Sequence, residues 1–171
     1  MSDSRRNPRS PRISTHSYPG TDFYSIIMKI NETIKQARIA CGFNDRELAD
    51  HLGITISEYM DIEFHEDELA SVVDLHVVRQ LCQILQLDAY DLLRIPEDNC
   101  STDQKRNELI ISQMNKLGIS NEDLADRIGF EVVAVSQFLL ADPDFLEKWT
   151  YNLIKELAKV LELPIQCLLR L

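Results

Sequence analysis

Apolar residues along most of the chain recur every three or four positions, which is the spacing of one face of an α-helix. The clearest example is the segment 74–87, whose apolar members are Leu75, Val78, Leu81, Cys82 and Leu85. Glycine, which readily adopts the left-handed conformation that ends helices, follows two other such segments at Gly42 and Gly53. The pattern predicts an all-helical (all-α) fold.

Capping residues indicate where the helices of the first part of the chain begin. Asn44 is followed three residues later by Glu47, the spacing of a capping box, and Thr55 can cap the next helix. An acidic loop should follow that helix, and Pro96 should end the unit, because proline cannot continue helical hydrogen bonding. The five expected helices lie at about residues 30–41, 45–53, 55–64, 74–87 and 89–94.

The same pattern occurs twice in the chain. Shifting the sequence by 76 positions brings residues 31–95 onto residues 107–171 without a gap, and it aligns Leu48 with Leu124. Chance would not keep apolar positions in phase over that length. We therefore predict two tandem five-helix domains, with caps at Ser120 and Glu131 in the second. The expected division is a disordered basic tail at 1–27, domains at 28–95 and 105–171, and a linker at 96–104.

A family resemblance follows from the segments after the first helix of each copy. Residues 42–54 read Gly-Phe-Asn-Asp-Arg-Glu-Leu-Ala-Asp-His-Leu-Gly-Ile, and residues 118–130 read Gly-Ile-Ser-Asn-Glu-Asp-Leu-Ala-Asp-Arg-Ile-Gly-Phe. Both resemble the helix-turn-helix core of the lambda-repressor/Cro family, and the later runs ending in Leu-Leu-Arg resemble its two closing helices. The resemblance implies two degenerate lambda-repressor-like domains. In that family the helix after the turn glycine is the recognition helix, which enters the major groove of DNA.

The residues at the expected DNA-reading positions are poorly suited to DNA. Those positions hold Ile56, Ser57, Glu58 and Asp61 in the first copy, and Val132, Val133, Ala134 and Gln137 in the second. Among them Gln137 alone is a side-chain type that commonly binds base edges. The stretch from Thr55 to Val78 has no Lys or Arg but several acidic residues, which would repel phosphates. We do not expect the recognition helices to bind DNA.

The charge distribution points instead to a protein partner. The chain has a net charge of −10, and an acidic face suits a basic protein. The candidate partner-binding residues are Glu58, Asp61, Glu63, Glu66, Asp67, Val132, Val133 and Gln137. Two plainer interpretations stay open. The acidic run can be a solvated face, and the apolar start of the second recognition helix can be buried against the neighbouring domain or in a homodimer.

These observations lead to two hypotheses for function. The first is a non-enzymatic protein-binding module, for example one that neutralises a basic toxin or nuclease, or that modulates a DNA-binding protein. The alternative is a DNA-binding transcriptional regulator of the lambda-repressor/Cro type. It is favoured by the family resemblance and by the tail arginines, since basic arms can follow DNA; these are Arg5, Arg6, Arg9 and Arg12.

Other classes of function find no support in the sequence. Cys41, Cys82, Cys100 and Cys167 form no Cys-x-x-Cys pair, so we expect neither a metal site nor a disulfide framework. Three of them should be buried at apolar helix positions, and Cys100 should be exposed in the linker. There is no phosphate-binding glycine loop, nucleophile motif or membrane-length apolar run. We expect no enzyme activity, no cofactor and a cytoplasmic location.

Overall fold

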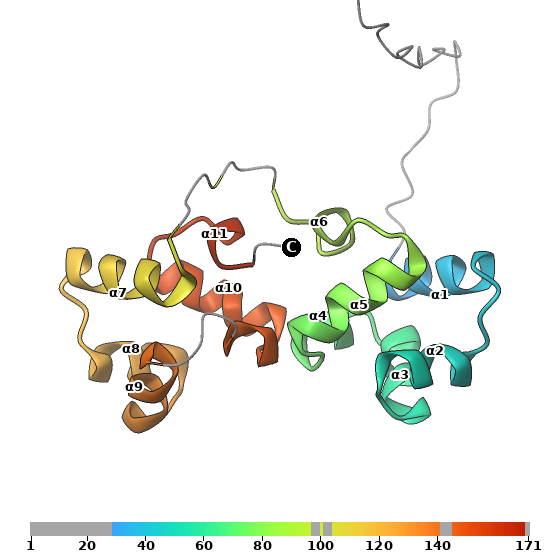
Figure 1. The fold of residues 1–171 in the computed structure, drawn as a ribbon, viewed down its shortest axis with the longest axis horizontal. Coiled ribbons are helices and arrows are strands. Elements are labelled where there is room, and N and C mark those ends of the chain that lie inside the picture. The colour runs from blue at the N-terminus through green and yellow to red at the C-terminus, as the bar shows by residue number, and fades with distance from the viewer. Residues whose placement is uncertain (1–28, 97–99, 101–103, 141–144, 170–171) are drawn as a thin grey trace, which may run out of the picture.

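The computed structural model describes residues 29–96, 100, 104–140 and 145–169, and the regular elements within these ranges are helices (Figure 1). The predicted all-helical fold is confirmed, while the basic tail at 1–27 lies outside the described residues. The N-terminal half contains α1 (Ile30–Ala40), α2 (Asp45–Leu52), α3 (Ile56–Phe64), α4 (Glu68–Ser71), α5 (Leu75–Leu85) and α6 (Ala89–Leu92). The C-terminal half contains α7 (Arg106–Leu117), α8 (Asn121–Ile128), α9 (Val132–Leu140), the 3-10 helix η1 (Phe145–Lys148), α10 (Tyr151–Val160) and α11 (Gln166–Leu169).

Local capping explains where α2 and α3 begin. The Asn44 side chain accepts a hydrogen bond from the Glu47 amide, and the Asn44 amide donates to the Glu47 carboxylate, each at 2.9 Å. Thr55 caps α3 in the same reciprocal way with Glu58. Gly53 ends α2 with a φ of 69°, a left-handed conformation that favours glycine. The predicted caps of α2 and α3 and the predicted end of α2 are therefore confirmed.

The segment between α3 and α5 differs from the prediction. An acidic loop was expected there, but residues 68–71 form the short helix α4. Its residue Leu69 is buried in the core, and this burial accounts for a helical turn within a charged stretch. At the corresponding place in the C-terminal half, η1 buries Leu146.

Helix bounds recur along the chain with the spacing expected from the sequence. The ends of α2 and α3 reappear 76 residues later as the ends of α8 and α9. Leu48 and Leu124 occupy matching positions on α2 and α8, and both side chains are fully buried, which confirms these two predicted core positions. Buried side chains from both halves belong to one continuous hydrophobic cluster.

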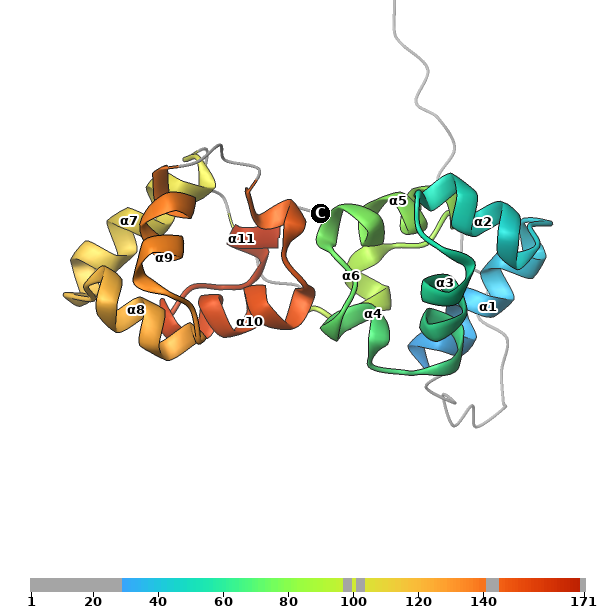
Figure 2. The same cartoon turned by 90° about the horizontal axis from the view of Figure 1, so that it is seen from below.

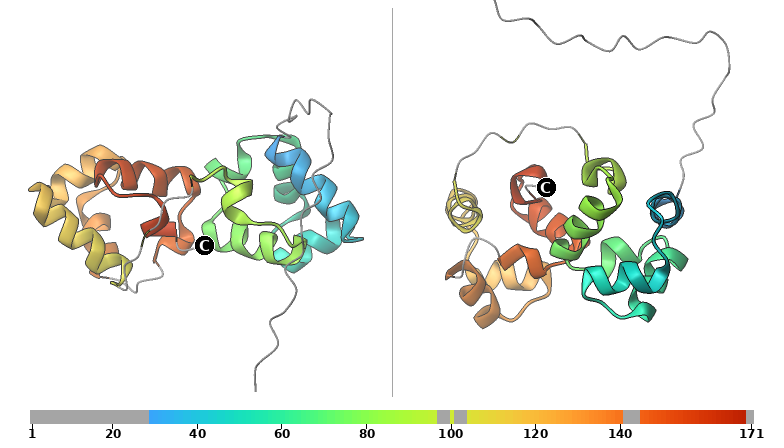
Figure 3. Two further views of the ribbon diagram at one scale, coloured as in Figure 1. Left: turned by 90° about the horizontal axis from the view of Figure 1, so that it is seen from above. Right: turned by 45° about the vertical axis from the view of Figure 1, so that its right-hand side comes forward.

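The two halves lie side by side and pack directly on each other (Figures 2 and 3). Helix α4 contacts α10, and α5 contacts η1. Between them Asp74 and Thr150 form an isolated antiparallel bridge, and the Leu75 amide donates to the Trp149 carbonyl at 2.9 Å. Because Asp74 and Thr150 themselves differ by 76 positions, the bridge joins equivalent points of the two halves.

Side-chain contacts across this junction are also reciprocal. His76 Nδ1 lies 3.1 Å from the Glu147 carbonyl oxygen, and Asn152 Nδ2 donates to Ser71 Oγ at 2.8 Å. Position 76 is equivalent to position 152, and position 71 to position 147, so the two contacts join the same pair of positions with the halves exchanged. Such an exchange of roles is typical of a two-fold interface between identical subunits. The junction is therefore pseudo-two-fold symmetric within a single chain.

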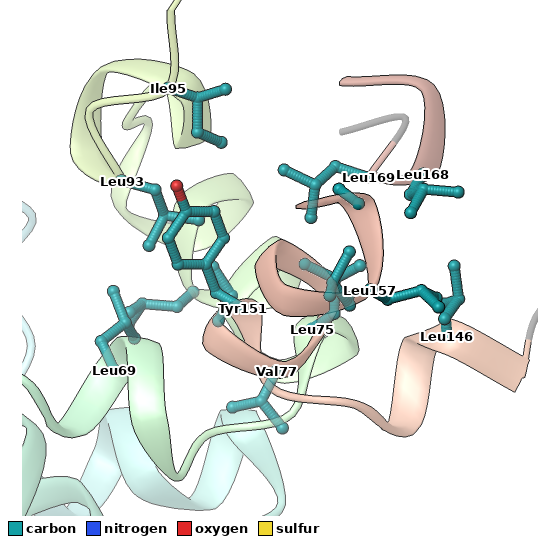
Figure 4. Close-up of a cluster of buried hydrophobic side chains, with 14 of the residues drawn as sticks. Leu69, Leu75, Val77, Leu93, Ile95, Leu146, Tyr151, Leu157, Leu168 and Leu169 are labelled. Carbon is teal, nitrogen blue, oxygen red and sulfur yellow. The ribbon is translucent and has the colours of Figure 1, made fainter. Parts of the chain in front are cut away.

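Apolar side chains fill the middle of the junction. Figure 4 shows Leu75 and Leu93 of the N-terminal half clustered with Tyr151, Leu157 and Leu169 of the C-terminal half. These side chains are buried, so the apolar surface that they remove from water stabilises the association of the halves. A direct hydrophobic contact thus holds the two halves together, in addition to the chain that connects them.

A charged network borders this apolar cluster. The Glu147 carboxylate accepts hydrogen bonds from Arg79 of α5, at 2.9 and 3.1 Å, and from Arg106 of α7, at 2.8 Å. Both arginines also donate to the Leu169 carbonyl, which ties α11 to the junction. Glu147 thereby connects the N-terminal half to two helices of the C-terminal half.

The cysteines differ from their predicted roles. Cys100 and Cys167 form a disulfide that links residue 100 to α11, with their Cα atoms 5.2 Å apart. Their separation of 67 residues hid the pair from motif analysis, and Cys100 is half-buried rather than exposed. Cys41, predicted to be buried, is exposed at the end of α1, whereas Cys82 is buried as predicted. Disulfides are uncommon in cytosolic proteins, and this one does not support the expected cytoplasmic location, which stays a prediction.

Candidate partner-binding surface

Helix α3 presents an apolar stripe on the outside of the N-terminal half. Its inward side chains, Tyr59 and Ile62, are buried in the core. On the opposite side Ile56 and Met60 are each 38% exposed and Phe64 is 64% exposed. The spacing of four residues places these three side chains next to one another along the helix. Sequence analysis did not select Met60 or Phe64, because apolar residues of an amphipathic helix are normally assigned to its core side.

Carboxylates lie close to this stripe in the sequence. Glu58, Glu66 and Asp67 are exposed, and Asp61 is half-buried. We call these four carboxylates, together with Ile56, Met60 and Phe64, the acidic face. Glu66 forms an exposed ion pair with Lys29, in which Lys29 Nζ lies 3.3 Å from Glu66 Oε2. The Thr55 amide hydrogen bond lowers the pKa of Glu58, so this residue remains ionised.

Glu63 was predicted to belong to the same surface, but it lies on the inner side of α3. Its carboxylate accepts hydrogen bonds from Arg38 Nε and from the Tyr59 hydroxyl, both at 2.6 Å. Arg38 also reaches Asp45 Oδ1 at 2.7 Å. Burial tends to raise the pKa of Glu63, but the hydrogen bonds from Arg38 and Tyr59 outweigh it and the pKa is lowered. Glu63 therefore fixes α3 against α1 and is not part of the acidic face.

The second set of predicted residues lies on α9 and forms a different surface. Val133 is 68% exposed and Leu140 is 86% exposed, while Gln137 is exposed and Val132 is half-buried. The junction with the N-terminal half involves η1 and α10, so it does not cover Val133. The interpretation that the neighbouring domain buries Val133 is wrong. Burial against a second chain stays a prediction.

The two sets of residues share one side of the molecule. In Figure 1 both α3 and α9 lie along the lower edge, one in each half. The pseudo-two-fold junction produces this placement, because it relates the two helices to each other. The structure thus brings the acidic face and the apolar surface of α9 to the same side without joining them into a single patch.

A groove that sequence analysis missed lies beside the acidic face. It has a volume of about 280 Å³ and lies between α3, α4 and the start of α5. Its lining includes the apolar Ile54, Ile62 and Val73 and the acidic Glu58, Glu68 and Asp74. The acidic residues were visible in the sequence, but only the fold shows that three of them border an apolar hollow.

No arrangement suited to a resident ion is found in the described part of the chain, where three or more His, Cys, Asp or Glu side chains do not converge on a metal-sized site. In the same residues no helix has both the length and the apolar character needed to cross a bilayer. Neither a protein-family model, nor a curated protein, nor a solved structure matches the chain.

Proposed function

We propose that the chain is a non-enzymatic protein-binding module made of two lambda-repressor-like helix-turn-helix domains, and that its acidic face binds a basic protein. The observation that carries the proposal is the outer surface of α3. At the position of a recognition helix, it exposes Ile56, Met60 and Phe64 next to carboxylates. An apolar centre bordered by charged residues is the usual composition of a protein-protein interface.

Electrostatics supports a basic partner over nucleic acid. Binding to DNA depends on Lys and Arg side chains that release counterions from the phosphates. The segment from Thr55 to Val78 contains no such side chain, and Glu58, Glu66 and Asp67 are exposed within it. Phosphates would be repelled from this surface, whereas a basic protein would be attracted and guided to it.

The two kinds of residue contribute differently to such a complex. Large apolar side chains that become fully desolvated supply most of the affinity in protein interfaces. Phe64 and Met60 can fill this role because they are already exposed. Charges at the rim mainly increase the association rate and exclude wrong partners. A basic toxin, a nuclease or a DNA-binding protein has the surface charge that this arrangement requires.

One observation favours a DNA-binding regulator as the second candidate. The pseudo-two-fold junction places α3 and α9 on the same side of the molecule, as dimeric repressors place their recognition helices for two half-sites (Figure 1). The basic tail could add phosphate contacts. In this alternative the side chains on α3 are the weak point, because Glu58 and Asp61 occupy positions that would face bases.

Charge reversal on the acidic face tests the proposal. The variant Asp61→Lys, Glu66→Lys, Asp67→Lys should lose capture of a basic protein from a nuclease-treated lysate of the source organism. The unmodified chain should retain that protein and release it at high salt, since exposed charges are screened beyond about 10 Å at 0.1 M. Glu58 and Glu63 are left unchanged, because the first accepts the Thr55 amide in the capping box of α3 and the second pairs with Arg38.

A matched control carries the same change in charge elsewhere. Asp126→Lys, Glu156→Lys, Glu162→Lys alters three exposed residues of the C-terminal half and should leave capture intact. Circular dichroism should show equal helix content for all three proteins. A second measurement titrates the unmodified chain with a random-sequence duplex. Micromolar binding to that duplex in physiological salt would replace the proposal with the regulator.

A further inference from the structure

The groove between α3, α4 and α5 has the size of a site for a single side chain. Its volume is about 280 Å³, just below the roughly 300–1,000 Å³ typical of small-molecule pockets. Ile54, Ile62 and Val73 give it an apolar lining, and Val72 beside them is 61% exposed. A long side chain with an aliphatic stem could bury that stem here.

Carboxylates give the groove a negative rim. Glu58, Glu68 and Asp74 each contribute to the lining. In the described ranges, no ion pair with a Lys or Arg is found for any of the three. His76 Nδ1 lies 3.9 Å from Asp74 Oδ2 and 3.1 Å from the Glu147 carbonyl oxygen. The rim therefore has unneutralised acceptors for a cationic group.

The C-terminal half shows how the same place looks when it is filled. The positions of Ile54, Ile62 and Val73 correspond, 76 residues later, to Phe130, Phe138 and Trp149. These rings pack on one another: Phe130 stacks on Trp149 with centroids 5.1 Å apart, and Phe138 meets Trp149 edge-on at 5.0 Å.

Two of the three rim carboxylates are also absent from the C-terminal half. The positions of Glu58 and Asp74 correspond to Ala134 and Thr150, while that of Glu68 corresponds to Asp144. Smaller apolar residues and additional carboxylates thus occur together in the N-terminal half only. A hollow that resulted from loose packing alone would not require the acidic substitutions at its border.

We propose that this groove binds an arginine side chain of the basic partner, an inference that rests on the proposed function and adds a defined subsite to it. Arginine fits both features. Its methylene stem can lie along Ile54 and Val73, which are half-buried in the groove lining, as long cationic side chains do on apolar surfaces. Its planar, weakly hydrated guanidinium has five donors for the carboxylates of Glu58, Glu68 and Asp74. Charge complementarity and the aliphatic lining together select this occupant.

The test is an NMR titration of the full chain with N-acetyl-L-arginine amide, using the citrulline analogue as the uncharged control. The arginine compound should shift the backbone amides of Gly53, Val72 and Val77, and the citrulline compound should bind at least tenfold more weakly. The variant Glu68→Gln, Asp74→Asn should lose at least tenfold in affinity. Equal shifts with both compounds, or binding unchanged in this variant, would overturn the inference.

A second variant fills the hollow without changing its charge. Val73→Trp introduces the residue found at the equivalent position of the C-terminal half and should abolish binding of the arginine compound. Because the Gln and Asn variant alters no volume, the test survives if Val73→Trp fails to fold. Binding that persists in a folded Val73→Trp chain would show that the ligand lies elsewhere.

Two outcomes separate this inference from the proposed function. If Glu68→Gln, Asp74→Asn captures the basic protein as well as the unmodified chain and binds the arginine compound normally, the groove is not the subsite, while the acidic face can still be the interface. The chain's own tail is the other occupant to examine. If replacing Arg5, Arg6, Arg9 and Arg12 with Gln shifts the groove amides before any ligand is added, the tail fills the groove and the partner assignment is overturned.

Discussion

Replacing the ion pair between α1 and α3 with the apolar residues of the other half should preserve the stability of the fold. The side chains of Arg38 and Glu63 are each 10% exposed, and the guanidinium donates to the carboxylate at 2.6 and 3.1 Å. At the equivalent positions the C-terminal half has Met114 and Leu139, both buried. Equivalent positions are therefore filled by a buried ion pair in the N-terminal half and by apolar side chains in the C-terminal half.

The expected change in unfolding free energy for each variant follows from the charged group that the variant leaves unpaired. Glu63→Leu alone strands the Arg38 guanidinium, and breaking a buried pair from one side costs about 3–5 kcal/mol. We expect a value near the lower end, because Arg38 keeps Asp45 at 2.7 Å and the Phe43 carbonyl at 3.0 Å. Arg38→Met with Glu63→Leu removes both charges, which is typically neutral or stabilising by about 1–4 kcal/mol. The coupling energy between the two changes should be at least about 3 kcal/mol.

The measurement is a double-mutant cycle by urea unfolding, monitored by circular dichroism. All variants carry Tyr59→Phe, because the Tyr59 hydroxyl donates to Glu63 and would otherwise lose its acceptor. In thermal unfolding, a loss of about 3 kcal/mol corresponds to a decrease of roughly 6–12 °C for a chain of this size. If the double variant is as unstable as Glu63→Leu alone, the assumed equivalence of the two halves at these positions is wrong.

Three further predictions concern stability. Because the pKa of Glu63 is lower in the folded chain than its ordinary value of 4.5, ionised Glu63 stabilises the fold above pH 4.5, and this stabilisation is lost as the pH falls through the folded-state pKa. Below pH 4.5 the unfolding free energy should therefore decrease more in the unmodified chain than in Glu63→Gln. Leu48→Ala and Leu124→Ala should each lower the free energy of urea unfolding by about 2–5 kcal/mol, because both side chains are fully buried. A decrease of less than about half a kcal/mol would show that these positions do not belong to the core. Reduction of Cys100–Cys167, which closes a 67-residue loop, should lower the unfolding free energy by about 4 kcal/mol, and a Cys100→Ser, Cys167→Ser chain should then show no response to reductant.

Features of the fold that depend on neighbouring residues could be predicted from sequence. The capping boxes of α2 and α3 are fixed by residues three positions apart, so Asn44 with Glu47 and the cap at Thr55 identified both helix starts. Gly53 ended α2 for an equally local reason. The identification of Leu48 as core followed from helical periodicity, which reflects burial directly.

Features that depend on distant residues could not be predicted in this way. Helix α4 exists because Leu69 is buried where α4 packs on α10, far along the chain. Glu63 looked like one more carboxylate of an acidic run, because its partner Arg38 is 25 residues away on another helix. The groove depends on residues from four helices and the loops between them, and only comparison with Trp149 and its neighbours shows which side chains leave it open.

The pseudo-two-fold junction has a consequence for how such a surface can evolve. In a homodimer every substitution appears twice, so a feature useful on one subunit is imposed on the other, and any cost to stability is doubled. Here His76 faces Glu147 while Asn152 faces Ser71, so each side of the same contact has been free to take its own residues. A chain of this kind keeps the paired geometry of a dimer, yet can retain an aromatic filling on one side and an open, acidic hollow on the other.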